Sequence, residues 1–280
     1  MIQFQMFRVK VHFPNQGTFF RENRSPSDVL REVIKSLPCA ELRTGRIWHI
    51  GNVEPVGMLS LYFRIGRSSR STLEVFKNGK FMDQEFETAP YTHVVVDTEL
   101  EVCAIARKPR LAKNPLGIAR QLARLLRQSE TAKHLETTFE IVELLDPEGL
   151  IQYLRSAVAI SKFSLTFSRP NPFDVNQYFQ APMEKYLEYA KGQKGKTEIS
   201  GENLESDVLE DLARSAAATG ENASASLQTE QGGPRLRKHL RPNPVFIQHE
   251  DLSDSDAKAS MLEEVRRKYR EIRQDIGDGS

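Results

Sequence analysis

The feature of this sequence that most constrains its fold is a strand–turn–strand–helix succession within residues 91–127. The apolar run at 94–96 meets a polar connection at 97–99, and a second apolar run follows at 100–106. Two apolar runs joined by a short polar turn are typical of paired antiparallel strands. Asn114-Pro115 precedes a leucine-rich run, and asparagine followed by proline is typical of a helix N-terminus. We therefore expect a strand pair and, after it, a helix.

The rest of the first third is rich in predicted strands. Asn78-Gly79 separates two apolar runs, and this dipeptide is a strong signal for a two-residue hairpin. Ser25-Pro26 opens one early helix, whose apolar stripe continues to Leu37. The expected strands cover residues 2–13, 47–50, 58–65, 73–76 and 80–86. Strands in succession with a single early helix favour the α+β class with a mainly antiparallel sheet.

The second half of the chain alternates predicted strands and helices. Gly220 follows an apolar helical stripe that includes Val208 and ends near Ala218, where a glycine commonly ends a helix. The expected helices cover 146–156, 178–191, 204–218 and 255–274, and the expected strands cover 139–144, 160–168, 197–200, 223–229 and 245–249. This pattern predicts two domains. A strand-rich α+β domain at 1–135 ends in the basic helix, and an α+β domain at 136–280 ends in a C-terminal helix.

Charge is segregated along the chain, although the formal net charge is only +1. No acidic residue occurs from Val102 through Ser129, whereas lysine and arginine recur there. An ordinary solvated helix face usually mixes both signs, so this imbalance favours a surface that contacts a polyanion, expected to be double-stranded DNA. The residues that we expect to contact nucleic acid are Arg107, Lys108, Arg110, Lys113, Arg120, Arg124, Arg127, Arg169, Arg235, Arg237, Lys238 and Arg241, with Arg64, Arg67 and Arg70 as further candidates.

A four-residue pattern occurs twice in the second half. Arg169-Pro170-Asn171-Pro172 follows an expected strand, and Arg241-Pro242-Asn243-Pro244 follows a basic segment. Each proline pair favours extended backbone and leaves the asparagine in a stiff turn. Chance or a shared way of ending a strand is the simpler explanation of the repeat. The alternative is a pair of similar arginine-bearing loops that contact successive phosphates.

The sequence carries no complete constellation for catalysis. Its six histidines are scattered without metal-ligand spacing, and two cysteines cannot form a zinc site alone. Cys39 and Cys103 both stand among apolar residues, so we expect small buried side chains and no disulfide. We predict no cofactor and favour a protein that is not an enzyme.

Asp97, Glu99 and Glu101 supply the best alternative, a metal-dependent nuclease. Such an enzyme needs two or more carboxylates that converge on a divalent ion. Turn hydrogen bonds by Asp97 and cross-strand pairing of Glu101 explain the same residues without catalysis. A third hypothesis is a non-enzymatic scaffold that binds another protein through the helix at 255–274.

The location is predicted from what the sequence lacks. No apolar stretch approaches the roughly 20 residues of a membrane span, and the N-terminal segment is typical of a strand and not of a signal peptide. We expect no membrane span and a cytoplasmic protein.

The order of elements around Val94 to Arg107 resembles that of a known family. An apolar strand, an acidic turn and an apolar strand ending in Ala106-Arg107, followed by a helix and a second α+β domain, are similar to the RexA/KwaB-like bacterial proteins of phage exclusion and anti-phage defence. The resemblance implies a cytoplasmic, homodimeric DNA-binding protein of a bacterial defence locus, with a partner protein of that system. It assigns no functional residue, because no motif matches position by position.

Overall fold

The computed structural model of the protein describes residues 1–13, 24–169 and 180–273. Contacts between Cα atoms divide the chain into two compact units. The first unit takes in Met1–Gln5, Val11–Ile141 and Gln248–Leu262, and the second takes in Met6–Lys10, Val142–Ile247 and Glu263–Ser280. The division into domains at 1–135 and 136–280 stays a prediction.

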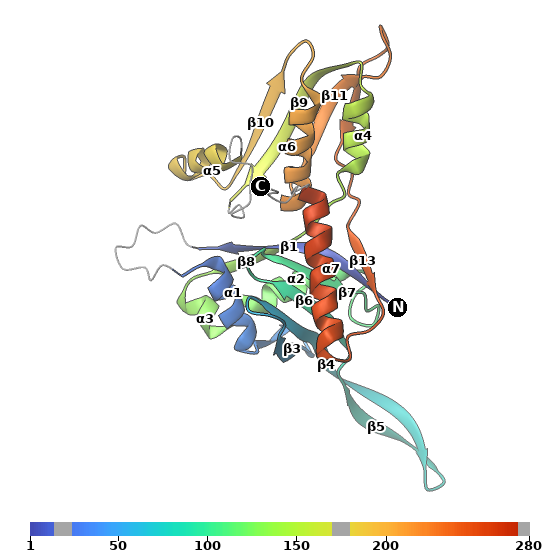
Figure 1. Cartoon of the computed structure of the whole chain (residues 1–280). Helices are drawn as coiled ribbons and strands as arrows, with labels where there is room; N and C mark the ends of the chain where they lie inside the picture. The colour runs from blue at the N-terminus through green and yellow to red at the C-terminus, as the bar shows by residue number, and fades with distance from the viewer. Residues whose placement is uncertain (14–23, 170–179, 274–280) are drawn as a thin grey trace. The chain divides into compact units, whose positions relative to one another are not determined.

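A nine-stranded sheet has most of its residues in the first unit (Figure 1). Its strands are β1 (Ile2–His12), β2 (Cys39–Arg43), β3 (Arg46–Pro55), β4 (Ser60–Lys77), β5 (Lys80–Thr88), β6 (Tyr91–Asp97), β7 (Val102–Ala106), β8 (Thr138–Glu143) and β13 (Phe246–His249). They follow the order β13-β1-β7-β6-β4-β3-β2, with β5 paired to β4 and β8 paired to β1. The pairings β2–β3, β3–β4, β4–β5, β4–β6 and β6–β7 are all antiparallel.

Seven helices lie within the described residues, so the expected α+β class with a mainly antiparallel sheet is confirmed. They are α1 (Pro26–Lys35), α2 (Pro115–Leu126), α3 (Glu130–His134), α4 (Glu148–Ser156), α5 (Gln180–Tyr189), α6 (Ser206–Thr219) and α7 (Ser255–Arg273). Across these described segments, no helix has the length and apolar character that crossing a membrane requires.

The strand pair and helix predicted at 91–127 are present as β6, β7 and α2. Every residue of β7 is buried, which explains its continuous apolar sequence. The Asn114 side chain accepts a hydrogen bond from the Gly117 N–H at 3.0 Å, and proline follows in the first turn of α2. The buried face of α2, which includes Ile118 and Leu122, packs against β2, β3 and β7. Local capping signals therefore fix where α2 begins and which face it buries.

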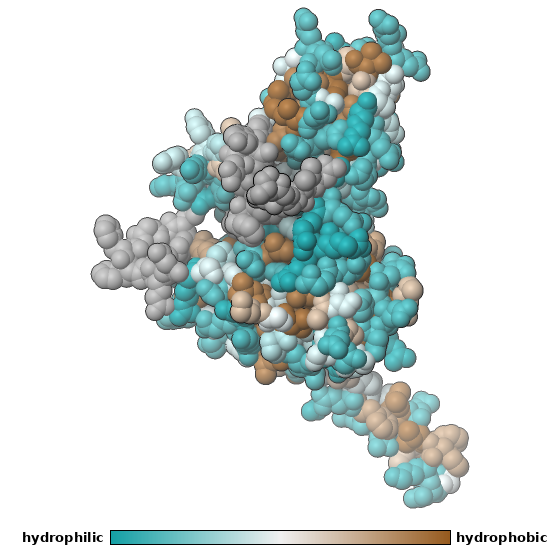
Figure 2. Space-filling model, in the orientation of Figure 1, coloured by the Kyte–Doolittle hydropathy of each residue, from teal (hydrophilic) through white to brown (hydrophobic). Residues whose placement is uncertain are grey.

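β4 extends past its pairing with β3 and forms a two-stranded arm with β5 at residues 69–88. Asn78-Gly79 closes the arm with positive φ at both residues, as the predicted hairpin requires. Every residue of β5 is exposed. Figure 2 shows apolar surface along the arm. Because a lone two-stranded hairpin is marginally stable in water, this arm would gain stability from being covered.

A four-stranded antiparallel sheet forms the framework of the second unit. Its strands are β9 (Ala159–Ser168), β10 (Lys194–Ser200), β11 (Ala223–Gln228) and β12 (Leu236–His239), in the order β10-β9-β11-β12. α4 and α6 pack against each other and against this sheet. The predicted end of α6 at Gly220 is confirmed, since this residue has φ 71° and a Cβ there would lie 2.7 Å from Val142 Cγ2.

Three sequence expectations about local structure are wrong. The runs at 58–65 and 73–76 belong to one strand, because β4 stays extended while its partner changes from β3 to β5. Cys39 is exposed, because it lies on edge strand β2, where alternate side chains face solvent, whereas Cys103 is buried as expected. Val208 of α6 is 59% exposed and does not join the core.

Candidate nucleic-acid interface

The basic residues predicted from 107 to 127 all lie in the first unit and are all exposed. Arg107, Lys108 and Arg110 occupy the connection after β7, Lys113 precedes α2, and Arg120 and Arg124 lie on its solvent face. For these six side chains, no carboxylate of a described residue lies within ion-pair distance. Their charges are therefore left to solvent or to a ligand.

Arg127 differs from the other six. Its Nε and Nη2 donate to the Phe139 carbonyl oxygen at 3.2 and 2.6 Å. These bonds tie the C-terminal end of α2 to β8, so this guanidinium has a structural role that the sequence did not indicate.

Three further arginines gather on one face of the sheet. Arg43 and Arg46 are direct cross-strand neighbours in the β2–β3 hairpin, and Arg67 of β4 lies opposite Trp48 of β3. Because residues two apart on a strand share a face, Arg46 and Trp48 point the same way, and Arg67 points with them. Arg67 Nη2 also donates to the Arg110 carbonyl oxygen at 3.3 Å. Arg43, Arg46 and Arg67 are called the basic cluster below.

The basic cluster is electrostatically uncompensated. Burial and then the charges of Arg46 and Arg43 lower the pKa of the Arg67 guanidinium. Arg67 Nε is buried and has no hydrogen-bond partner among the described residues. The nearest acidic side chain along the hairpin, Glu41, accepts the Gly45 N–H at 2.5 Å and thereby stabilises the turn. An anion at this position would offset the repulsion among the arginines and would accept a hydrogen bond from Arg67 Nε.

The opposite face of the same sheet carries cations that do have partners. Arg64 Nε donates to Tyr62 Oη at 3.1 Å, and its guanidinium lies 4.7 Å from the centre of the Tyr91 ring. Lys258 Nζ lies 2.6 Å from Glu54 Oε2. Arg64, although a sequence candidate, is thus held by aromatic neighbours. Arg70 lies opposite Glu87 in the arm.

The candidates of the second unit are divided between different environments. Arg169 forms an ion pair with Glu188 at 3.5 Å, and Lys238 Nζ lies 4.0 Å from the centre of the Tyr153 ring. Arg237 Nη2 donates to Ser224 Oγ at 3.4 Å, on the other face of β12 from Lys238.

Arg235 and Arg241 are exposed, and within the described segments neither has an ion-pair partner. The first repeated loop lies in residues 170–179, outside the described residues, so the pairing of the two similar loops stays a prediction.

The carboxylates of the nuclease alternative do not converge. Asp97 is buried, and its Oδ1 accepts the N–H groups of Glu99 and Leu100 at 3.1 and 3.0 Å, as expected of a turn residue. The side chain of Glu99 is exposed. Over the described parts of the chain, no group of three or more His, Cys, Asp or Glu side chains is arranged to hold a metal ion.

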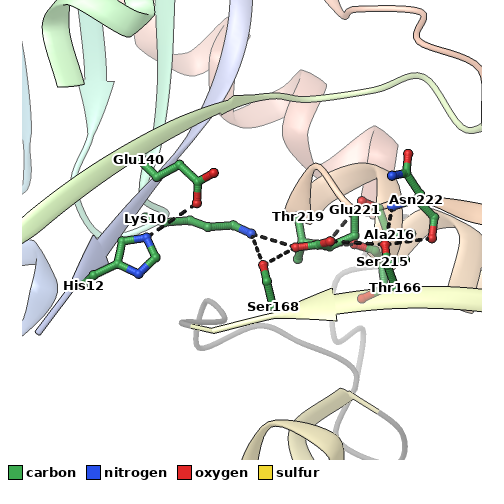
Figure 3. Close-up of polar contacts among 10 residues, drawn as sticks. All are labelled: Lys10, His12, Glu140, Thr166, Ser168, Ser215, Ala216, Thr219, Glu221 and Asn222. Atoms are coloured by element: carbon green, nitrogen blue, oxygen red, sulfur yellow. Dashed lines mark hydrogen bonds and ion pairs between the residues drawn. The ribbon is translucent and has the colours of Figure 1, made fainter. Parts of the chain in front are cut away.

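The second unit contains a buried polar cluster that the sequence did not indicate. Lys10 Nζ lies 2.9 Å from both Glu221 Oε1 and Ser168 Oγ, and Thr166 Oγ1 donates to Glu221 Oε2 at 3.2 Å (Figure 3). Burial opposes ionisation of Glu221, but the Lys10 charge and the hydrogen bonds from Ser168 and Lys10 outweigh it and lower the pKa of this carboxyl.

A serine beside a lysine can suggest a nucleophile and its base. Here Lys10 Nζ is held in an ion pair with the Glu221 carboxylate, so it is not placed to act as a base toward Ser168. Ser168 also donates to Glu221. The cluster therefore acts as a buried ion pair with its hydrogen bonds satisfied, and not as a catalytic site.

Comparison of the chain with protein-family models gives no match, and comparison with curated proteins gives none either.

Proposed function

We propose that the protein binds nucleic acid, with duplex DNA as the expected class, through the basic cluster and the neighbouring exposed cations of α2. The observation that supports this function is the crowding of Arg43, Arg46 and Arg67 on one sheet face without a compensating carboxylate among the described residues. Folding normally separates like charges or pairs them with acids. A group that does neither is typical of a site for an anionic ligand.

The chemistry of the cluster suits phosphate. A guanidinium is planar, stays charged and presents its donors in a fork that matches two phosphate oxygens. Three neighbouring strands, β2, β3 and β4, supply these guanidiniums, so the sheet fixes the spacing of their backbones. Contacts of this kind reach the backbone of DNA and carry no sequence information directly. We therefore expect binding that varies little with sequence and strongly with salt.

α2 extends the same surface. It packs against β2, the strand that carries Arg43, and Arg120 and Arg124 are one turn apart on its exposed side. The N-terminal approach to α2 adds Lys113. A duplex presents phosphates along its whole length, so a surface with several rows of cations matches it better than it matches a single small anion.

The direct test compares two triple variants that lose the same charge. In Arg43→Gln/Arg46→Gln/Arg67→Gln the basic cluster is removed. In the control, Arg266→Gln/Arg267→Gln/Lys268→Gln, the lost cations are those that α7 pairs with Glu263, Glu264 and Glu271. Binding of a labelled duplex of about 20 base pairs is measured by fluorescence anisotropy at low salt.

We expect the cluster variant to bind at least about tenfold more weakly than the wild type, because charge-assisted hydrogen bonds are lost. The control variant should bind within about twofold, because its cations are already occupied. Equal weakening of both variants would show that only net charge matters and would contradict the proposal. Circular dichroism melting verifies that both variants fold, and a single-stranded probe of the same length tests the preference for duplex.

Membership of a defence locus, a partner protein, a homodimer and a cytoplasmic location stay predictions from the sequence. The nuclease alternative gains no support from the positions of Asp97 and Glu99.

A further inference from the structure

The free edge of β5 carries a regular pattern of acids. Asp83, Glu85 and Glu87 alternate along the strand and so project from one face of the arm, while Met82 and Phe86 project from the other. β5 pairs with β4 along one edge, and in the described part of the chain nothing pairs with its other edge. Met82 and Phe86 are 43% and 36% exposed. This edge is an open template for another strand.

The free edge of β12 carries the complementary pattern. Arg237 and His239 fall on one face and Leu236 and Lys238 on the other, and Arg235 directly precedes the strand. β12 is the terminal strand of its sheet and, among described residues, pairs only with β11. Leu236 is 38% exposed. Acidic and apolar side chains therefore alternate along the free edge of β5. Basic and partly apolar side chains alternate along the free edge of β12.

The backbone of β5 presents its acidic residues outward. Lys77 and Lys80 flank a two-residue turn and so form a hydrogen-bonded pair, which makes the even-numbered residues of β5 bond to β4. The odd-numbered residues, which include the three acids, then direct their N–H and C=O groups to the free edge.

The backbone of β12 follows the same parity. The Leu240 N–H donates to the Ala223 carbonyl oxygen at 2.8 Å, so the even-numbered residues bond to β11. Arg237 and His239 direct their backbone groups to the free edge, and a strand that continued to Arg235 would do the same there. The outward positions of both strands therefore carry the opposite charges.

We infer that β5 of one chain pairs with β12 of a second copy, antiparallel and with Glu85 opposite Arg237. This register places Glu87 opposite Arg235 and Phe86 opposite Leu236. Opposite charges then face each other on one side of the joined sheet, and an aromatic ring meets a leucine on the other. Both partners in this pairing direct outward backbone groups at each other, so the main chain forms a continuous hydrogen-bond ladder.

The same charges disfavour the alternative pairings. Two β5 edges joined to each other would place acids against acids, and two β12 edges would place arginines against arginines. Charge repulsion thus disfavours β5–β5 and β12–β12 pairing, and charge attraction favours β5–β12 pairing. A reciprocal exchange of arms between two copies would satisfy both edges of each copy in a dimer.

This inference does not depend on the proposed DNA binding, because it uses neither the basic cluster nor α2. It gives Arg235 and Arg237 a role in a protein interface in place of the predicted phosphate contacts. The occupant is a second copy because the chain itself supplies the strand that matches β5 in charge, side-chain alternation and backbone parity.

A charge-swap experiment tests the pairing. The arm variant carries Asp83→Lys, Glu85→Lys and Glu87→Lys, and the edge variant carries Arg235→Glu and Arg237→Glu. Masses of the wild type, of each full-length variant alone and of their equimolar mixture are measured by analytical ultracentrifugation over a concentration series. A second arm variant, with Asn or Gln at the three acidic positions, replaces the lysine variant if that one fails to fold.

We expect a wild-type dimer that weakens with added salt, and at least a tenfold loss of self-association in each variant alone. The mixture should recover the dimer, since one junction is then native and the other has its charges exchanged. A wild type that stays monomeric at all concentrations overturns the inference. So does a dimer that persists in both variants, because association then uses another surface, and so does a mixture that stays monomeric.

Discussion

The basic cluster and the Lys10–Glu221 cluster differ in what surrounds their cationic side chains. In the second unit, a lysine that is only 3% exposed meets the Glu221 carboxylate and the Ser168 hydroxyl group. In the first unit, Arg67 is partly buried beside Arg43 and Arg46, and no carboxylate of the described residues compensates them. Burial alone therefore does not decide what a cation does. The sign of its neighbours decides whether the charge stabilises the fold or remains free for a ligand.

The largest effect is expected at the compensated cluster. Lys10→Met would leave the Glu221 carboxylate buried without its cation, and breaking a buried pair in this way costs about 3–5 kcal/mol of unfolding free energy. Urea unfolding followed by circular dichroism measures the loss. A loss below about 1 kcal/mol would show that water already reaches Glu221.

The double variant Lys10→Met/Glu221→Gln is the matched control. It removes both charges and keeps a group that can accept from Ser168 and Thr166. We expect it to regain more than half of the lost stability, because the cost arises from the orphaned charge and not from the missing lysine.

The same cluster should give the wild type a defined loss of stability in acid. The pKa of Glu221 is lowered on folding, so its contribution is complete above the unfolded value of about 4.3 and disappears as pH falls through the lower folded value. We expect the urea midpoint to fall more steeply below pH 4.3 in the wild type than in Lys10→Met/Glu221→Gln. Parallel profiles for the two proteins would contradict this linkage.

A matched pair on α2 sharpens the comparison within one helix. Arg127→Gln removes two hydrogen bonds to the Phe139 carbonyl and should cost about 1–2 kcal/mol of stability with little effect on DNA affinity. Arg124→Gln should leave stability unchanged and weaken DNA binding, since its side chain is exposed. Thermal melts and anisotropy titrations of both variants separate these roles. The reverse pattern would contradict the assignment.

The smallest effect is expected at the basic cluster itself. Arg46→Gln removes one like charge from the surroundings of Arg67 and should stabilise the protein by about 0.2–0.5 kcal/mol while lowering DNA affinity. Paired urea curves at low salt detect such a difference. A destabilised variant would mean that Arg46 makes a favourable contact that outweighs the repulsion.

Local signals in the sequence were enough to predict where α2 begins and where the arm turns. Asn114-Pro115 marks the start of α2, and Asn78-Gly79 marks the turn of the arm, because in each case one or two residues determine the backbone conformation. The run without acids from Val102 to Ser129 correctly drew attention to exposed cations. These features depend on neighbours in the chain, which a sequence displays directly.

Which residues form the basic cluster depends on strand register, and the register cannot be predicted from local sequence signals. Arg43 and Arg46 were not candidates, and they join Arg67 only because β3 pairs with β4 so that Trp48 lies opposite Arg67. Lys10 and Glu221 meet across 211 residues. Arg127 was a candidate of the right charge, but its guanidinium donates hydrogen bonds to the carbonyl oxygen of Phe139, 12 residues later. Long-range pairing therefore decides which cations stay free.

The salt dependence of DNA binding tests the central claim most directly. The slope of log K against log salt is measured for the wild type and for Arg43→Gln/Arg46→Gln/Arg67→Gln. Each lost phosphate contact lowers the magnitude of the slope by about 0.9, so we expect the triple variant to fall below the wild type by about 2.7. Equal slopes for the two proteins would show that the basic cluster does not contact phosphate.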